Sequence, residues 1–244
     1  MKLISFDLEI AKLLPLKVDN LFDHAPLGIS CAAVAHDDVR FWSGMPQLSK
    51  EECQTLVKDL MAYAADGYSF VSWNGCGFDF QVLAQESGMV AECGELALNH
   101  IDLMLLVTFS KGWFLGLDKA LAGANIAGKV HELTLKNGET LHEMSGALAP
   151  KLWSEGEHDA VLTYLRGDVE QTLALAQDVA ETQSIRWTSG RGKPQSVSVP
   201  QLLSVRECFN IPEPDTSWMD APPAREDFVK WIPGWEQKAM GRLF

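Results

Sequence analysis

The chain has 244 residues, of which 47% are hydrophobic and 22% are charged, so it can bury a full core and is neither disordered nor fibrous in composition. Its formal net charge of −13 excludes a surface dominated by phosphate contacts, since such contacts require clustered Lys and Arg. Binding of a short stretch of nucleic acid is compatible with this charge, because bound cations would neutralise several carboxylates.

Location and redox state follow from what the sequence lacks. No apolar run approaches the roughly 20 residues that cross a bilayer, and the first residues do not have the pattern of a secretory signal. The five cysteines form no CxxC pair and no Cys/His cluster at zinc spacing. We therefore expect a cytoplasmic protein with reduced thiols and no membrane partner.

The first part of the chain has the patterns of strands. Alternating or continuous apolar runs with strand character occur at residues 2–9, 27–35, 39–43 and 68–74. Asp37 and Asp38 lie between the second and third runs, where a short hairpin turn uses such residues. The first three strands are therefore expected to be antiparallel neighbours.

Helical patterns follow, and several have recognisable ends. Ser49 is expected to cap an amphipathic helix, Gly88 closes the next one, and Asp102 and Gly112 open and close a third. The longest helical pattern spans residues 157–182. Another short helix is expected at residues 117–125, and the glycine-interrupted stretch that follows it carries no clear pattern.

Composition shifts near residue 185, where Pro, Trp and Ser become frequent. We place a boundary there, between a domain of residues 1–184 and a C-terminal extension of residues 185–244. The extension is too rich in large aromatic residues for a disordered segment, so it is expected to pack on the domain. Its tryptophans are Trp187, Trp218, Trp231 and Trp235.

Asp7 and Glu9 lie two residues apart on a predicted strand, so their carboxylates share one face of the sheet. Two like charges in a half-buried position are costly unless a cation neutralises them. Carboxylate oxygens select hard divalent ions such as Mg²⁺ or Mn²⁺. Taken alone, such a pair is more often simply exposed.

Two further pairs carry polar chemistry. Asn74 and Asp79 lie between a buried strand and a helix, where open α/β sheets present functional groups. A turn followed by a helix-capping aspartate is the alternative there. Tyr164 and Asp168 are four residues apart and share one helical face, as do many pairs that only pack.

Together the three elements, D-x-E on an early strand, N-x-x-x-F-D after a later strand and Y-x-x-x-D on a late helix, resemble the motifs of the DEDD 3'→5' exonuclease superfamily. Within this superfamily, the motif with Tyr164 resembles that of the DEDDy branch. The DEDDh branch has a histidine at the position of Thr163. The chain is similar over about residues 1–184 to predicted exonucleases related to the proofreading domain of family B DNA polymerases. This resemblance implies an α/β, RNase H-like fold, with a mixed five-stranded sheet flanked by helices.

The resemblance also implies roles for individual residues. Two ions of Mg²⁺ or Mn²⁺ would be held by four carboxylates, those of Asp7, Glu9, Asp79 and Asp168. Tyr164 would help to position the attacking water. Asn74 and Phe78, in the second motif, are candidates for substrate contact. By contrast, Asp102 is expected to cap a helix rather than to serve the site.

A local basic island begins the extension. Residues 183–206 contain no acid, and Arg186, Arg191 and Lys193 supply positive charge beside Trp187. These four residues are candidates for substrate binding, with cations on phosphates and the indole stacked on a base. A solvated hairpin with a glycine-rich turn is the alternative.

The function expected is two-metal-ion 3'→5' exonuclease activity on the 3' end of single-stranded nucleic acid, with DNA favoured. An exoribonuclease is one alternative. A nuclease-like accessory subunit of a DNA repair or replication assembly is another, and the sequence identifies no protein partner.

Overall fold

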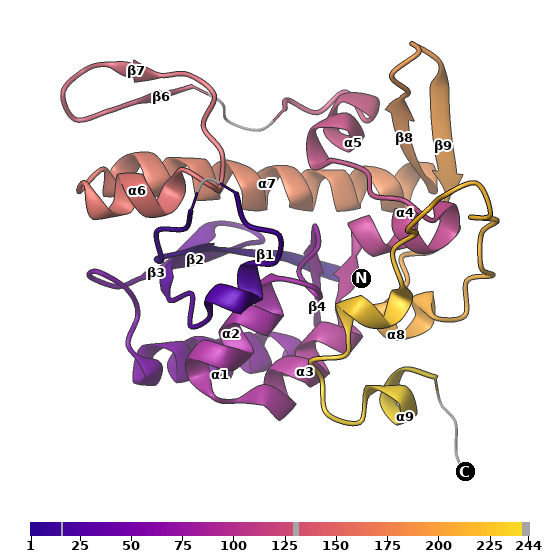
Figure 1. Ribbon diagram of the computed structural model, residues 1–244, viewed down its shortest axis with the longest axis horizontal. Helices are drawn as coiled ribbons and strands as arrows, with labels where there is room; N and C mark the ends of the chain where they lie inside the picture. The colour runs from indigo at the N-terminus through magenta and orange to yellow at the C-terminus, as the bar shows by residue number, and fades with distance from the viewer. Residues whose placement is uncertain (16, 129–131, 241–244) are drawn as a thin grey trace.

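The computed structural model describes residues 1–15, 17–128 and 132–240. A mixed five-stranded sheet forms its centre (Figure 1), in the strand order β3-β2-β1-β4-β5. β1 pairs antiparallel with β2 and parallel with β4, while β2–β3 is antiparallel and β4–β5 parallel. This is the RNase H-like fold class that the sequence predicts. Its strands are β1 (Lys2–Ile10), β2 (Ile29–Ala35), β3 (Val39–Ser43), β4 (Tyr68–Ser72) and β5 (Ile101–Asp102).

Helices cover both faces of the sheet (Figure 1). The long helix α7 (His158–Thr182) crosses one face, and α1 (Lys50–Ala65) and α2 (Asp79–Ser87) lie on the other. Successive residues of β1 point to opposite layers. Phe6 packs against Phe80 of α2, with ring centroids 5.2 Å apart, whereas the Ser5 hydroxyl donates to the Val169 carbonyl of α7 at 2.7 Å. The central strand is therefore buried on both sides.

The remaining elements connect or flank these layers. These elements are η1 (Leu21–His24), α3 (Val90–Asn99), α4 (Leu103–Lys111), α5 (Leu117–Gly123), β6 (Leu133–Thr134), β7 (Thr140–Leu141), α6 (Ala149–Ser154), β8 (Ser184–Thr188), β9 (Pro194–Ser198), α8 (Val205–Cys208), η2 (Arg225–Phe228) and α9 (Trp235–Met240). No helix in the described part of the chain is long and apolar enough to cross a membrane.

The predicted helix ends are confirmed. Ser49 forms a reciprocal capping box with Glu52 at the start of α1. Gly88 and Gly112 end α2 and α4 with positive φ angles of 73° and 79°, the left-handed conformation that glycine adopts without strain. Local sequence chemistry alone determines these ends.

Helix α3 is an element that the sequence does not predict. Gly94 lies inside it and lowers its helix propensity. A Cβ at this position would lie 2.7 Å from Cγ2 of Ile232, which belongs to the C-terminal segment. Close packing between segments distant in the sequence therefore requires the glycine at this position.

The C-terminal segment contacts the body of the protein through backbone carbonyls. Trp231 donates its indole N–H to the Cys76 carbonyl at 2.9 Å. Arg225 donates to the Phe109 carbonyl at 2.9 Å, and its guanidinium lies 4.8 Å from the Phe109 ring centroid. The same guanidinium bonds the carbonyl of Ile211 at 2.7 Å. These bonds tie α4 to the extension, while the predicted boundary at residue 184 stays a prediction.

Replacing Arg225 by Ala is expected to lower the free energy of unfolding by about 2 kcal/mol, because bonds from a charged donor each contribute about 1.5–3 kcal/mol. Urea denaturation measures the change. Lys230→Ala is the control, since Lys230 contacts only a neighbouring exposed Asp227 among the described residues and surface pairs of this kind contribute little. Equal stability of both variants would contradict the prediction.

Candidate active site

The candidate site begins where β1 extends past β4. The parallel ladder between these strands runs from Lys2 to Ser5 on β1. Farther along β1, the amide of Leu8 donates to Oδ1 of Asp79 at 3.1 Å. The carboxylate at the start of α2 thus continues the hydrogen bonding of the central strand. This bond joins the first predicted motif to the second.

Side chains from β1 and α7 meet on the α7 side of the sheet. Asp7 and Glu9 follow Ser5 on this face of β1, and Tyr164 and Asp168 lie one turn apart on α7. All four border one cavity of about 190 Å³, here called the acid pocket. Acids from opposite ends of the chain therefore share a pocket, whereas Asp79, the fourth predicted acid, is not among its lining residues, and a catalytic role of these residues stays a prediction.

Most of these polar groups are almost excluded from water. The exposed fractions are 6% for Glu9, 3% for Asp79, 4% for Asp168 and 2% for Tyr164, whereas Asp7 is half-buried. Charged carboxylates in such surroundings lose most of their hydration. Close like charges at this depth favour either a shared proton or a bound cation.

The pKa of Asp79 reflects this environment. Burial raises the pKa of Asp79 to about 7, against the opposing effect of hydrogen bonds from Asp7 and from the Leu8 amide. Asp79 therefore holds a proton at higher pH than an exposed aspartate does, and the Asp7 carboxyl group lies close enough to influence it.

The donors present suit a hard cation. Cys31 lies opposite Glu9 in the β1–β2 ladder, and burial, reinforced by the charge of Glu9, raises the pKa of its thiol far above the usual range. This cysteine is therefore a neutral thiol, and the carboxylates are left as oxygen donors, which Mg²⁺ and Mn²⁺ prefer. Among the described residues, no group of three or more His, Cys, Asp or Glu side chains is arranged so that it could already hold a metal ion.

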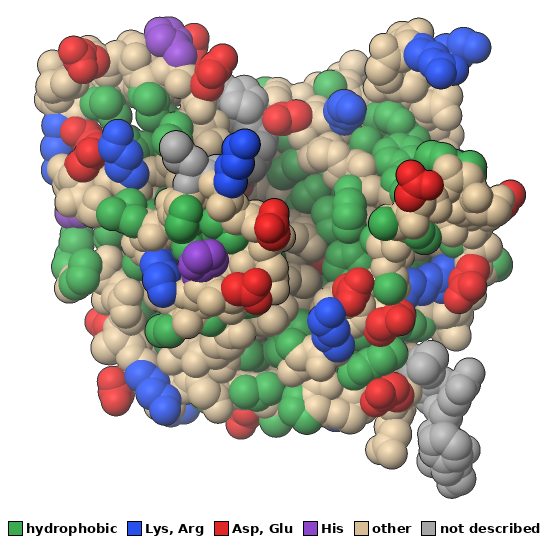
Figure 2. Space-filling view, in the orientation of Figure 1, with side chains coloured by type: hydrophobic (Ala, Val, Ile, Leu, Met, Phe, Trp, Pro, Cys, Tyr) green, Lys and Arg blue, Asp and Glu red, His purple; other side chains and the backbone are tan. Residues whose placement is uncertain are grey.

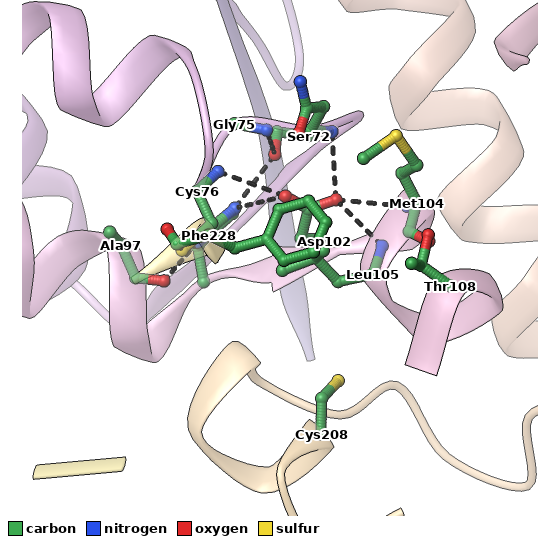
Figure 3. Close-up of polar contacts among 12 residues, drawn as sticks. Ser72, Gly75, Cys76, Ala97, Asp102, Met104, Leu105, Thr108, Cys208 and Phe228 are labelled. Carbon is green, nitrogen blue, oxygen red and sulfur yellow. Dashed lines mark hydrogen bonds and ion pairs between the residues drawn. The ribbon is translucent and has the colours of Figure 1, made fainter. Parts of the chain in front are cut away.

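Asp102 supports the loop that carries the second motif (Figure 3). Its Oδ1 accepts from the amides of Met104 and Leu105, which confirms the predicted helix cap. The same carboxylate accepts from the amide of Asn74 at 2.9 Å and from that of Cys76 at 3.1 Å. One fully buried side chain thus fixes both the start of α4 and the loop before Asp79.

A second contact reinforces this loop (Figure 3). The Ser72 hydroxyl is hydrogen bonded to Nε2 of His100 at 2.9 Å and accepts from the Gly75 amide at 3.0 Å. A Cβ on Gly75 would lie 2.3 Å from that hydroxyl oxygen. Glycine is therefore required at this close approach, and His100 is a buried structural residue.

The two substrate candidates of this loop lie differently. Phe78 borders the acid pocket and is half-buried. Asn74 has a positive φ of 71° and accepts the Phe78 amide through its carbonyl, but it is not among the pocket-lining residues. The turn expected as the alternative at Asn74 is thus present, and its contact with substrate stays a prediction.

Sequence reasoning missed several residues of the pocket. Thr172 follows Asp168 by one further turn of α7, so helical periodicity would have found it. Gly146 lies near Glu9, since a Cβ there would be 3.6 Å from its Oε2, and no local signal indicates this. The pocket residues without a predicted role are Phe6, Leu8, Trp73, Leu117, Gly146 and Thr172.

The basic island forms the β8–β9 hairpin, with Arg191 and Lys193 exposed at its turn. Trp187 is only 4% exposed and packs edge-on against Trp113, with centroids 5.6 Å apart. Arg186 makes two bonds of 2.8 Å to Asp178. The hairpin is therefore present, and the expected stacking of a base on Trp187 is not available because its ring lies inside the fold, while contact of Arg191 and Lys193 with substrate stays a prediction.

The chain belongs to the RNase_H superfamily, whose profile matches residues 23–180. Members of this superfamily are typically nucleases that use divalent metal ions. The matched range begins after β1, so it does not include Asp7 and Glu9. No curated protein matches the chain.

The fold is similar to a solved structure of the family B DNA polymerase from the hyperthermophilic archaeon Pyrobaculum calidifontis, with a TM-score of 0.52 and 16% sequence identity. The similarity covers 72% of this chain and 24% of the polymerase. The chain therefore spans about a quarter of that protein, and at this identity the likeness concerns the fold alone.

The raised pKa of Asp79 predicts a pH-dependent stability. An unfolded Asp has a pKa of about 3.9, so between about pH 4 and pH 7 the folded state binds more protons than the unfolded state. Without metal, the free energy of unfolding should therefore fall as pH rises through this window and level off above it. The fall is on the order of a few kcal/mol, at about 1.4 kcal/mol per pKa unit.

Asp79→Asn is expected to remove the contribution of Asp79 to this pH dependence, because the amide oxygen still accepts from Leu8 while the side chain at position 79 no longer titrates. Urea denaturation of both proteins in EDTA between pH 4 and pH 8 measures the difference. Parallel stability curves would show that Asp79 does not titrate as described.

Asp102→Asn is expected to lower the free energy of unfolding by about 1–3 kcal/mol, because the new amide group would face the Cys76 N–H and leave this buried donor without an acceptor. Denaturation in urea measures the loss. Asp37→Asn serves as a control, since its side chain is 97% exposed. An unchanged free energy of unfolding in Asp102→Asn would contradict the role of this carboxylate in fixing both the start of α4 and the loop before Asp79.

Proposed function

We propose that this protein is a metal-dependent 3'→5' exonuclease, which hydrolyses phosphodiester bonds at the 3' end of single-stranded nucleic acid, with DNA as the favoured substrate. The observation that carries the proposal is the meeting of the motifs in space. Asp7, Glu9, Tyr164 and Asp168 border one pocket, and Asp79 accepts the amide of Leu8, the residue after Asp7. A purely structural role gives no reason to gather four acids, three of them buried, in one region.

Superfamily membership supports hydrolysis of nucleic acid. The fold likeness to a family B DNA polymerase supports the narrower resemblance to exonucleases related to such polymerases. Polarity from the 3' end rests on the motif resemblance alone.

The carboxylates of Asp7, Glu9, Asp79 and Asp168 would hold two Mg²⁺ or Mn²⁺ ions. Bound there, the ions would neutralise charge on the phosphate and lower the pKa of a water molecule. The Tyr164 hydroxyl would orient this water. The water oxygen would form a bond to phosphorus while the bond between phosphorus and the 3' oxygen of the preceding nucleotide breaks. The released 3' oxygen would take up a proton, and a nucleoside 5'-monophosphate would leave.

Residues around the acids would position the substrate. Phe78 and Trp73 border the pocket and offer apolar surface to the terminal base. Arg191 and Lys193, exposed at the hairpin turn, are proposed to contact phosphates farther along the strand. All five cysteines are buried free thiols, which supports the proposed cytoplasmic location.

The test uses a 5'-labelled single-stranded oligonucleotide with Mg²⁺ or Mn²⁺. We expect a ladder that shortens from the 3' end and disappears with EDTA. Asp7→Asn and Asp168→Asn should each reduce the rate at least about 100-fold, because lost metal ligands remove several kcal/mol of transition-state stabilisation. Tyr164→Phe should lower kcat by up to about 100-fold through a misplaced water while calorimetric Mn²⁺ binding is retained.

Glu170→Gln is the matched control, since Glu170 is an exposed acid on the same helix. Its rate should equal that of the unmodified protein. RNA and a 3'-blocked oligonucleotide are tested in parallel, so that faster loss of RNA would identify an exoribonuclease. Activity that survives Asp168→Asn, or that ignores the 3' block, would refute the proposal.

A further inference from the structure

Two exposed aromatic side chains gather beside the hairpin. Phe114 is 56% exposed and Trp218 is 69% exposed, although large aromatic rings are usually buried. They come from separate parts of the chain, yet both border one depression of about 310 Å³. We call this depression the α5–hairpin groove, and its other lining residues are Trp113, Leu115, Lys119, Trp187, Thr188, Ser189, Gly190 and Gln195.

The floor of the groove is closely packed. Trp113 and Trp187 pack edge to face beneath it. The hairpin also lies directly on α5, since a Cβ on Gly123 would be 1.8 Å from the Arg186 carbonyl oxygen. The Trp218 indole N–H donates to the Asp215 carbonyl at 3.2 Å. The exposed aromatic side chains therefore lie beside a packed surface.

Positive charge surrounds the groove in a strongly acidic protein. Lys119 lines it, and Arg191 and Lys193 lie exposed at the adjoining turn, in a stretch of 183–206 without acids. Figure 2 shows basic side chains on the upper right lobe, where the hairpin lies. Acids also lie near the groove residues in sequence, with Asp118 directly before Lys119 and with Asp215 and Asp220 on either side of Trp218.

Helix α5 links the groove to the candidate active site. Helix α5 contributes Leu117 to the acid pocket and Lys119 to the groove. The two depressions therefore lie on either side of one helical turn. Figure 2 shows this face of the molecule hollowed between the lobe of β6 and β7 and the lobe of β8 and β9.

We propose that the α5–hairpin groove binds single-stranded nucleic acid, with bases stacked on Phe114 and Trp218 and phosphates near Lys119, Arg191 and Lys193. The strand would continue over the first turn of α5 with its 3' end in the acid pocket, so the inference extends the proposed function. Aromatic faces flanked by cations are the surface that unpaired bases require. A duplex hides its base faces, and the net charge of −13 opposes its denser phosphates.

Binding is measured in EDTA, by fluorescence anisotropy of labelled oligonucleotides of about 20 nucleotides. Phe114→Ala and Trp218→Ala should each weaken binding of single-stranded DNA about tenfold, as expected for a lost base stack. Arg191→Ala combined with Lys193→Ala should reduce the slope of log K against log salt by about 1.4, for two lost phosphate contacts. Met61→Ala is the control, since Met61 is also exposed, at 42%, and borders a different pocket.

Single-stranded RNA and duplex DNA form separate arms. Equal binding of the two single strands and weak binding of the duplex agree with the proposal, as does a preference for either single strand. Tighter binding of duplex would overturn it. Unchanged affinity in both aromatic variants, or loss of affinity in the Met61 control as well, would also overturn it.

Binding without metal separates this inference from the catalytic proposal. If oligonucleotides bind as described but are not degraded, the groove stands and the exonuclease assignment fails. If oligonucleotides are degraded and the aromatic variants leave both binding and KM unchanged, the groove fails alone. With active protein, the variants should raise KM for long substrates about tenfold and leave kcat unchanged, with little effect on substrates of about three nucleotides.

Discussion

The site depends on the bond between the Leu8 amide and the Asp79 carboxylate. β1 is the central strand, and where its pairing with β4 ends a side chain from α2 accepts the next hydrogen bond. This bond places Asp79 beside the strand that carries Asp7, and Asp7 borders the acid pocket with Tyr164 and Asp168 of α7. Because most of these carboxyl groups are buried, their charge is costly unless a proton or a cation neutralises it. The proposed metal ions would meet this requirement.

The loop between β4 and α2 is held from behind by structural polar groups. Asp102 bonds the amides of Asn74 and Cys76, and Ser72 bonds that of Gly75. None of these supports lines the acid pocket. Conversely, Asp79 ends the loop and has its own bond to β1. Loop shape and acid position are thus determined by separate contacts, which lets the loop present Phe78 without displacing the carboxylate.

The sequence predicts those parts of the structure that local chemistry determines. Helix ends at Ser49, Gly88 and Gly112 follow from capping and left-handed glycine, and the spacing of Asp7 and Glu9 places them on one face. Contacts made by distant segments were not predictable in this way. Gly94 is needed in α3 because Ile232 packs against it, and Trp187 is buried in contact with Trp113. Gly146 reaches Glu9 without any local signal.

The formal net charge of −13 opposes the binding of a polyanion. Long-range electrostatic attraction therefore cannot bring phosphates to this protein, and screening limits the reach of its Lys and Arg side chains to about 8–10 Å. Affinity would then come from contacts that charge does not oppose, namely stacking on Phe114 and Trp218. Cations held by the buried acids would supply positive charge only at the bond to be cleaved. A protein that attracts phosphates weakly at long range but binds bases by stacking would favour single-stranded ends over duplexes.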